Sequence, residues 1–217
     1  MRLISVNVGK VRDNPWKSGA DRTGIDKRPV EGPVAVAAPG PKGTGAVGLA
    51  GDRVYDVKHH GGDIQAVYAY SQEDYGYWET ELGRTLRPGM FGENLTTEGL
   101  VVSDAVVGER WRIGADVVLQ VTVPRVPCGT FRGWMDEKGW LKTFTAAART
   151  GAYLSVVEPG EIRAGDDITV ESRPEHGVTV STVFRALMTD RSLLPEILTA
   201  PELPDETRRQ ANRRLSQ

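Results

Sequence analysis

The 217-residue sequence has little cysteine, little histidine and no long apolar run. Its single cysteine, Cys128, excludes an internal disulfide and any zinc site built from several cysteines. Three histidines are too few for a histidine-rich metal cage. No apolar run approaches the ~18 residues of a membrane span, and residues 2–8 are too short for the apolar part of a signal peptide. We therefore expect a cytoplasmic protein without a membrane partner.

An excess of charge of one sign is also lacking. The formal net charge is −2, and 26% of the residues are charged, with both signs mixed along the chain. Duplex DNA or RNA requires a broad basic surface, so nucleic acid is not an expected partner. Hydrophobic residues make up 39% of the chain, which is enough to bury the core of one sizeable domain, with or without a small appendage.

Glycine and proline separate short apolar runs that are rich in valine, isoleucine, tyrosine and threonine, which is typical of strands. These runs cover residues 3–8, 64–70, 108–114, 117–123, 153–157 and 168–171. Helices are predicted over residues 71–82, which begin with a serine cap and an acidic turn, and over residues 138–150. The predicted fold class is mainly β (α+β), with a few helices packed on a β body. Residues 12–29 are predicted to be a polar loop that acts as a mobile lid.

The sequence changes character near residue 175. Three short helices, separated by prolines and polar turns, are predicted over Val180–Asp190, Leu193–Thr199 and Pro204–Leu215. We therefore divide the chain into a first domain of residues 1–174 and a small helical domain of residues 175–217.

Cys128 ends the segment Pro124-Arg125-Val126-Pro127-Cys128, directly after the strand-like run 117–123. Each proline fixes φ at about −65°, so the segment is predicted to leave the strand stiffly and to present the thiol at a fixed place. Arg125 would lower the pKa of a nearby thiol, and Gly129 leaves room for a large group. The alternative is a small, buried and inert cysteine, and the local sequence leaves both interpretations open.

Residues 51–63 hold more titratable groups than any other stretch. No metal-ligand spacing is evident there, so a zinc hydrolase has little support. Lys58, a protonated His59 or His60 and the N–H groups of Gly61-Gly62 would together suit a phosphate or a carboxylate. A polar loop whose histidines bond to the backbone is the alternative.

Two further glycine-containing stretches resemble binding sites. Gly92, Glu93 and Asn94 leave a turn for a strand and would fix a polar ligand by hydrogen bonds, unless the asparagine only satisfies its own turn. Residues 43–48 match the letters of the dinucleotide fingerprint, but no strand precedes them and no helix follows. We therefore interpret residues 43–48 as a flexible loop and expect no nicotinamide site.

Five short motifs follow one another along the chain. They are Gly51-Asp52, His60-Gly61-Gly62, Phe91-Gly92-Glu93-Asn94-Leu95, Gly108-Glu109-Arg110 and Pro124-Arg125-Val126-Pro127-Cys128. In this order they resemble the MOSC family, named for the C-terminal domain of molybdenum cofactor sulfurases, and most closely its YiiM-like branch. The resemblance covers about residues 2–172, and residues 177–217 resemble the small three-helix domain of YiiM-like proteins.

The resemblance implies a β-barrel body that holds the pyranopterin molybdenum cofactor, with Cys128 as catalytic residue and protein ligand to molybdenum. The residues expected to bind the cofactor are Lys10, Lys58, His59, His60, Gly61, Gly62, Gly92, Glu93, Asn94 and Arg125. The implied activity is reduction of small N-hydroxylated amines, amidines and purine bases. Electrons would come from an external reductase that carries flavin or an iron–sulfur cluster. The chain has no room for a pyridoxal-phosphate domain, so cysteine desulfuration is not expected.

The sequence leaves two alternatives open. The chain would share every binding residue if it were a carrier that hands molybdenum cofactor to another enzyme. A cofactor-free thiol enzyme would instead use Cys128 as nucleophile and His59 or His60 as base. Assembly as a homodimer is left open as well.

Overall fold

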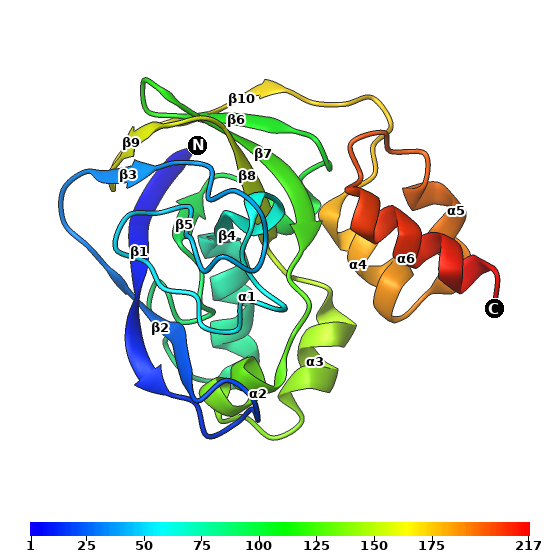
Figure 1. The fold of residues 1–217 in the computed structure, drawn as a ribbon, viewed down its shortest axis with the longest axis horizontal. Coiled ribbons are helices and arrows are strands. Elements are labelled where there is room, and N and C mark those ends of the chain that lie inside the picture. Colours follow the sequence, from blue (N-terminus) through cyan, green and yellow to red (C-terminus); the bar gives the residue numbers. More distant parts are fainter.

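A computed structural model describes all 217 residues, which form ten strands and six helices (Figure 1). The strands are β1 (Arg2–Asp13), β2 (Arg22–Pro29), β3 (Val34–Val36), β4 (Val67–Ser71), β5 (Leu95–Glu98), β6 (Arg110–Ile113), β7 (Val117–Pro124), β8 (Ala152–Glu158), β9 (Gly160–Ile162) and β10 (Ile168–Ser172). The helices are α1 (Gln72–Leu82), α2 (Gly129–Met135), α3 (Trp140–Ala147), α4 (Val180–Met188), α5 (Leu194–Ile197) and α6 (Asp205–Leu215). None of them has the length and hydrophobicity needed to cross a lipid bilayer.

Eight strands form one mixed sheet in the order β10-β6-β7-β8-β4-β5-β1-β2, and β3 pairs with β9 in a second, small sheet. Only β4 and β5 run parallel as neighbours in the large sheet. Each of the six predicted strand runs overlaps an observed strand. The prediction of a mainly β body with a few packed helices is therefore confirmed.

The large sheet is not a closed barrel, which corrects that part of the expectation. The start of β1 does reach β10, because Leu3 N–H donates to Asp166 O over 2.9 Å and Ile168 N–H donates to Met1 O over 2.9 Å. Only one bridge, between Arg2 and Asp167, joins the two strands. From Asn7 onward, β1 pairs with β2 instead, so no continuous ladder closes the sheet.

The prediction of a loop over residues 12–29 is wrong for most of that stretch. β1 continues to Asp13, and β2 pairs with it antiparallel, so only residues 14–21 form the connection. The sequence does not predict this strand because β2 carries charge at Asp26 and Lys27, where an apolar alternation would signal a strand. Both charged side chains are buried and satisfied by partners that are distant in sequence.

An aromatic core lies beneath the segment that carries Cys128. Helix α1 begins at the cap of Ser71, whose Oγ accepts a hydrogen bond from Asp74 N–H over 3.2 Å, as predicted. Trp78 of α1 stacks on Phe144 of α3 with ring centroids 5.8 Å apart. Phe131 of α2 packs edge-on against the same Phe144 at 5.1 Å. Together these rings fix α2, whose N-terminal cap position is Cys128, on a rigid base.

The three predicted C-terminal helices are confirmed, and they gather at one end of the molecule, away from β1 and β2 (Figure 1). They enclose an apolar core of their own, formed chiefly by α4, α5 and α6. Backbone hydrogen bonds from Val180 N–H to Ala105 O (2.9 Å) and from Val107 N–H to Val178 O (3.0 Å) attach this end to the β body. The division into two domains near residue 175 stays a prediction.

Candidate functional site

Cys128 follows β7 and lines a cleft. Residues 125–127 leave the strand, and Cys128 then takes an extended conformation (φ −121°, ψ 172°) at the cap position of α2. The side chain is half-buried and lines a cleft that holds about 860 Å³ of empty space, its open mouth included. The thiol therefore borders a hollow that is open to solvent.

The surroundings of Cys128 favour a thiolate. Burial by itself raises the pKa of a thiol, but three contacts outweigh it here. A hydrogen bond with His60, the charge of Arg125 and the backbone N–H of Phe131 together lower the pKa of Cys128 from 9.0 to about 6. At neutral pH the sulfur is therefore mostly ionised, which makes it a nucleophile and a soft metal ligand.

Arg125 supplies a buried positive charge beside the thiolate. Its guanidinium lies 4.0 Å from the ring centroid of Phe131 and 5.2 Å from that of Tyr68, and it donates to the carbonyl of Phe91. Burial lowers the pKa of an arginine, but the electrostatic effects of Tyr68, Tyr153 and Cys128 raise that of Arg125. The guanidinium thus stays charged and is held in one orientation by aromatic and carbonyl contacts.

A second buried ion pair, between Lys27 and Asp52, also lines the cleft. Lys27 Nζ lies 2.6 and 2.5 Å from the two carboxylate oxygens of Asp52. Gly9 N–H (2.8 Å) and Asn94 Nδ2 (2.8 Å) also donate to that carboxylate. Desolvation raises the pKa of Asp52, but Lys27 and these donors bring it below its usual value. One carboxylate therefore joins β1, β2, the loop after Leu49 and the turn before β5.

Two glycines allow these segments to approach so closely. A Cβ on Gly9 would lie 2.5 Å from the carbonyl oxygen of Gly24, and a Cβ on Gly24 would lie 2.5 Å from that of Arg53. Both distances are shorter than any real Cβ contact, so a larger residue would force the strands and the Asp52 loop apart.

The structure brings six of the predicted site residues into one cleft. Those residues are Cys128, His60, Gly61, Gly92, Asn94 and Arg125. They come from the loop before β4, the turn before β5 and the exit of β7, which are far apart in the sequence. The order of the motifs along the chain thus corresponds to segments that converge around one hollow.

Five other predicted residues do not line the cleft. They are Lys10, Lys58, His59, Gly62 and Glu93. Lys10 and Lys58 are exposed, and His59 Nδ1 lies 2.9 Å from an oxygen of Asp56. Glu93 is fully buried and accepts hydrogen bonds from Tyr75 Oη (2.7 Å) and Gly89 N–H (2.5 Å), so it holds the turn before β5.

Several residues that line the cleft are not predicted by the sequence. They are Arg22, Lys27, Asp52, Arg53, Gln65 and Tyr68. Asp52 belongs to the first of the five motifs, whereas Lys27 lies in the strand β2, where the sequence predicts a loop. Gln65 is distinctive because its Oε1 is buried and has no hydrogen-bond partner within the protein. The cleft therefore contains one polar atom that a bound ligand could satisfy.

The chain does not build a metal site from its own carboxylates, imidazoles and thiol. No group of three or more histidine, cysteine, aspartate or glutamate side chains is placed to hold an ion.

Comparison with known proteins shows the family to which the chain belongs. Residues 56–169 match the MOSC domain, and the chain belongs to the MOSC domain family. Within that family it is YiiM-like: it superposes on the crystal structure of YiiM from Geobacillus stearothermophilus with a TM-score of 0.77 and 26% identity, over 99% of this chain and 98% of that one.

Two relatives add to this assignment. The uncharacterized protein YflK of Bacillus subtilis (strain 168) is 32% identical over 183 residues, which cover 84% of this chain and 79% of YflK. A protein named reductase from Gibberella moniliformis (strain M3125 / FGSC 7600) is 28% identical over 207 residues, or 92% of this chain and 35% of that protein. The match to the fungal protein is thus confined to about a third of its length.

We predict that the single thiol titrates with a midpoint near pH 6. The rate of alkylation by iodoacetamide reports the thiolate fraction, so it should be high at neutral pH and fall as the pH drops through that midpoint. His60→Ala removes the hydrogen bond and should shift the midpoint upward, whereas His59→Ala is a matched control and should not. A wild-type midpoint above roughly pH 8, as in a free thiol, would contradict the prediction of a stabilised thiolate.

We also predict that the Asp52–Lys27 pair is essential for stability. Asp52→Asn leaves Lys27 buried without its counter-charge and should lower the free energy of unfolding in urea by about 3–5 kcal/mol. Asp116→Asn, in the exposed β6–β7 turn, should change it by less than about 0.5 kcal/mol. Because the folded-state pKa of Asp52 is lowered, its contribution is complete above the unfolded value of 3.8 and is lost as the pH falls. The difference between wild type and Asp52→Asn should therefore shrink on acidification, and equal stabilities at pH 7 would refute the essential role of the pair.

Proposed function

We propose that this chain binds the molybdenum cofactor and reduces N-hydroxylated compounds, with Cys128 as the protein ligand to molybdenum. The observation that carries the proposal is a thiol of lowered pKa beside a buried arginine, in the lining of a cleft that is open to solvent. Membership of the MOSC family and the relative named reductase support the same chemistry.

The residues present fit such a cofactor. A thiolate is a soft ligand, suited to a soft, redox-active metal, and metal binding favours the ionised form further. The unpaired Gln65 Oε1 would accept a hydrogen bond from a ring N–H of a pterin, and Arg22 and Arg53 line the same cleft with cationic groups for a phosphate. When bound, the cofactor supplies two-electron redox chemistry that no side chain of this chain provides.

The protein residues would then hold the cofactor, compensate its charge and protonate the substrate. Cys128 holds the cofactor through its sulfur, and Arg125 compensates the negative charge of that sulfur from the buried side. Asp52 and Lys27 keep the two sides of the cleft together without adding net charge. His60 is the only histidine that lines the cleft, so its ring N–H is the proposed proton source.

The overall reaction is balanced by two electrons and two protons. The N–O bond of R–NHOH breaks, the nitrogen becomes R–NH2, and the oxygen leaves as water. The electrons must come from a separate donor, since the chain is proposed to carry no flavin, haem or iron–sulfur cluster of its own.

One second candidate draws on a specific contact. His60 lies close enough to Cys128 to lower the pKa of the thiol, as a base does beside a nucleophilic thiol, so a thiol enzyme without cofactor is the second candidate. Full activity in metal-free protein, lost on alkylation of Cys128, would favour it. Transfer of cofactor to an apo-enzyme without any turnover would favour a carrier.

We predict stoichiometric molybdenum in wild-type protein produced in a host that synthesises the cofactor. Cys128→Ala should lose most of the metal, and His59→Ala, whose ring points to Asp56, should keep it. The wild type should reduce a hydroxylaminopurine or an amidoxime with a chemical electron donor. Equal molybdenum in wild type and Cys128→Ala would overturn the ligand assignment, and full loading without turnover of any N-hydroxylated substrate would overturn the reductase assignment.

A further inference from the structure

The outer face of the β1–β2 hairpin differs chemically from the face toward the cleft. Side chains alternate along β2, so Ile25 and Lys27 line the cleft whereas Asp26 and Arg28 belong to the opposite face. The register places Lys10 directly across from Asp26. This register explains why Lys10, expected near the cofactor, stands on the outside of the hairpin.

Three arginines converge on Asp26. Arg12 Nε lies 2.5 Å, Arg28 Nε 2.6 Å and Arg87 Nη2 2.8 Å from its carboxylate oxygens. The side chain of Asp26 is completely enclosed, whereas those of Arg12, Arg28 and Arg87 are 51%, 38% and 29% exposed. One carboxylate is thus covered by three guanidiniums, and two positive charges remain uncompensated at the surface.

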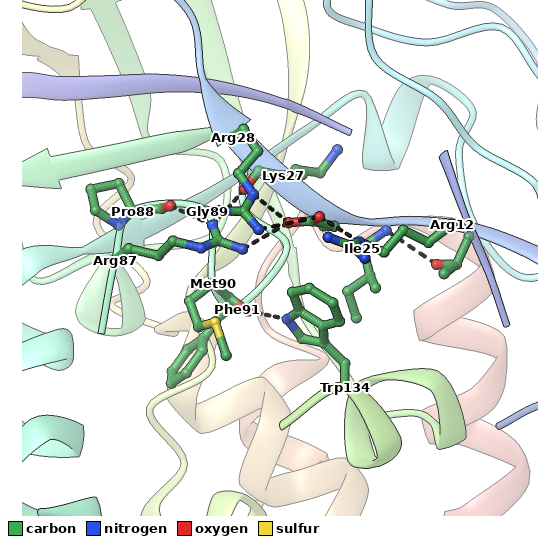
Figure 2. A network of polar contacts seen from close by, with 12 residues as sticks. Arg12, Ile25, Lys27, Arg28, Arg87, Pro88, Gly89, Met90, Phe91 and Trp134 are labelled. Atoms are coloured by element: carbon green, nitrogen blue, oxygen red, sulfur yellow. Dashed lines mark hydrogen bonds and ion pairs between the residues drawn. The ribbon is translucent and has the colours of Figure 1, made fainter. Parts of the chain in front are cut away.

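Contacts with Trp134 and with the backbone restrain Arg12 and Arg87 before any partner arrives. Arg12 and Arg87 lie 5.9 and 6.0 Å from the ring centroid of Trp134, whose Nε1–H donates to Met90 O over 2.8 Å (Figure 2). Arg87 also donates to Lys27 O over 2.6 Å. Arg12 uses only its Nε–H, so four of its five N–H donors remain free. Such preorganisation lowers the entropic cost of binding an anionic surface.

We call Arg12, Arg28 and Arg87 the arginine cluster. Its positive charge is a local feature, because the net charge of the whole chain is −2. Lys10 adds a fourth cation across from Asp26, and Asp13 is the acidic residue of the same strand end, paired in register with Arg22. The positive charge is thus concentrated on the outside of one hairpin whose inside lines the cleft.

We propose that the arginine cluster is the docking surface for an acidic redox protein that delivers electrons to the cleft. This inference rests on the proposed reductase function. The donor is a protein with a reduced flavin and carboxylates around that group. Two electrons pass from the flavin per turnover, in one encounter or in two successive ones, and the flavin is oxidised, while the substrate takes up these electrons and two protons and loses its oxygen as water. Carboxylates match the guanidinium forks, and the charge difference steers the encounter.

The test uses a purified acidic flavodoxin as the probe and the cofactor-loaded enzyme. Binding is measured by calorimetry at low and high salt, and turnover is measured with reduced flavodoxin and, separately, with dithionite and a viologen. The test variant is Arg12→Gln/Arg28→Gln, which leaves Arg87 on Asp26. Arg12→Lys/Arg28→Lys keeps the charge, and Arg209→Gln/Arg213→Gln removes two exposed arginines from α6 as the matched control.

The glutamine variant should bind flavodoxin more weakly and lose roughly 10-fold or more in kcat/KM with flavodoxin as donor. Its rate with dithionite and viologen and its molybdenum content should match wild type, whereas its melting temperature should fall because the buried Asp26 keeps only Arg87 as a partner. The lysine variant should retain most of the flavodoxin-dependent rate, the α6 variant all of it, and high salt should reduce the wild-type rate.

Equal flavodoxin binding by wild type and the glutamine variant would overturn the docking surface, as would an equal loss in the α6 variant. Wild-type binding that salt does not weaken would do the same. Absence of turnover with dithionite and viologen would instead overturn the reductase function, and the binding arm would still decide the docking surface by itself.

Discussion

The buried positive charge of Arg125 is the constraint on which the site depends. An ionised thiol is costly to hold in a half-buried position unless an opposite charge and hydrogen-bond donors compensate it. Arg125 provides the opposite charge and is itself held by the rings of Phe131 and Tyr68 and by the carbonyl of Phe91. His60, which also lines the cleft, further lowers the pKa of the thiol. The aromatic core therefore has a role beyond packing, because its rings position the guanidinium of Arg125, which keeps Cys128 ionised.

The Asp52–Lys27 pair holds together several of the segments that line the cleft. It joins a strand pair to two loops, and Gly9 and Gly24 let their backbones approach closely enough for one carboxylate to reach all of them. The hairpin β1–β2 thus has two faces with different charge. Its inner face carries a neutral ion pair, whereas its outer face carries the arginine cluster around Asp26. A single polar hairpin thereby borders the cleft and presents the surface proposed for the electron donor.

The sequence predicts the apolar strands, two of the three body helices (α1 and α3) and the C-terminal helices, because their signals are local: alternation, caps and proline breaks. It does not predict α2, which begins directly after Cys128. It also predicts Cys128 and Arg125 as neighbours in one rigid segment, and the cleft contains both. It does not predict β2, since the charges of Asp26 and Lys27 are satisfied by Arg12, Arg87 and Asp52, and no local pattern shows such partners. The sequence predicts Glu93 as a ligand-binding residue because it does not show the partners of this carboxylate. In the structure the carboxylate accepts hydrogen bonds from Tyr75 and from the backbone N–H of Gly89.

The role of Cys128 as a metal ligand is tested most directly by X-ray absorption at the molybdenum edge of protein loaded with cofactor in a competent host. We predict one metal–sulfur distance in the wild type beyond those of the cofactor's own sulfurs, and its disappearance in any metal that Cys128→Ala retains. An identical sulfur shell in the two proteins would contradict the claim that the Cys128 thiolate binds the metal.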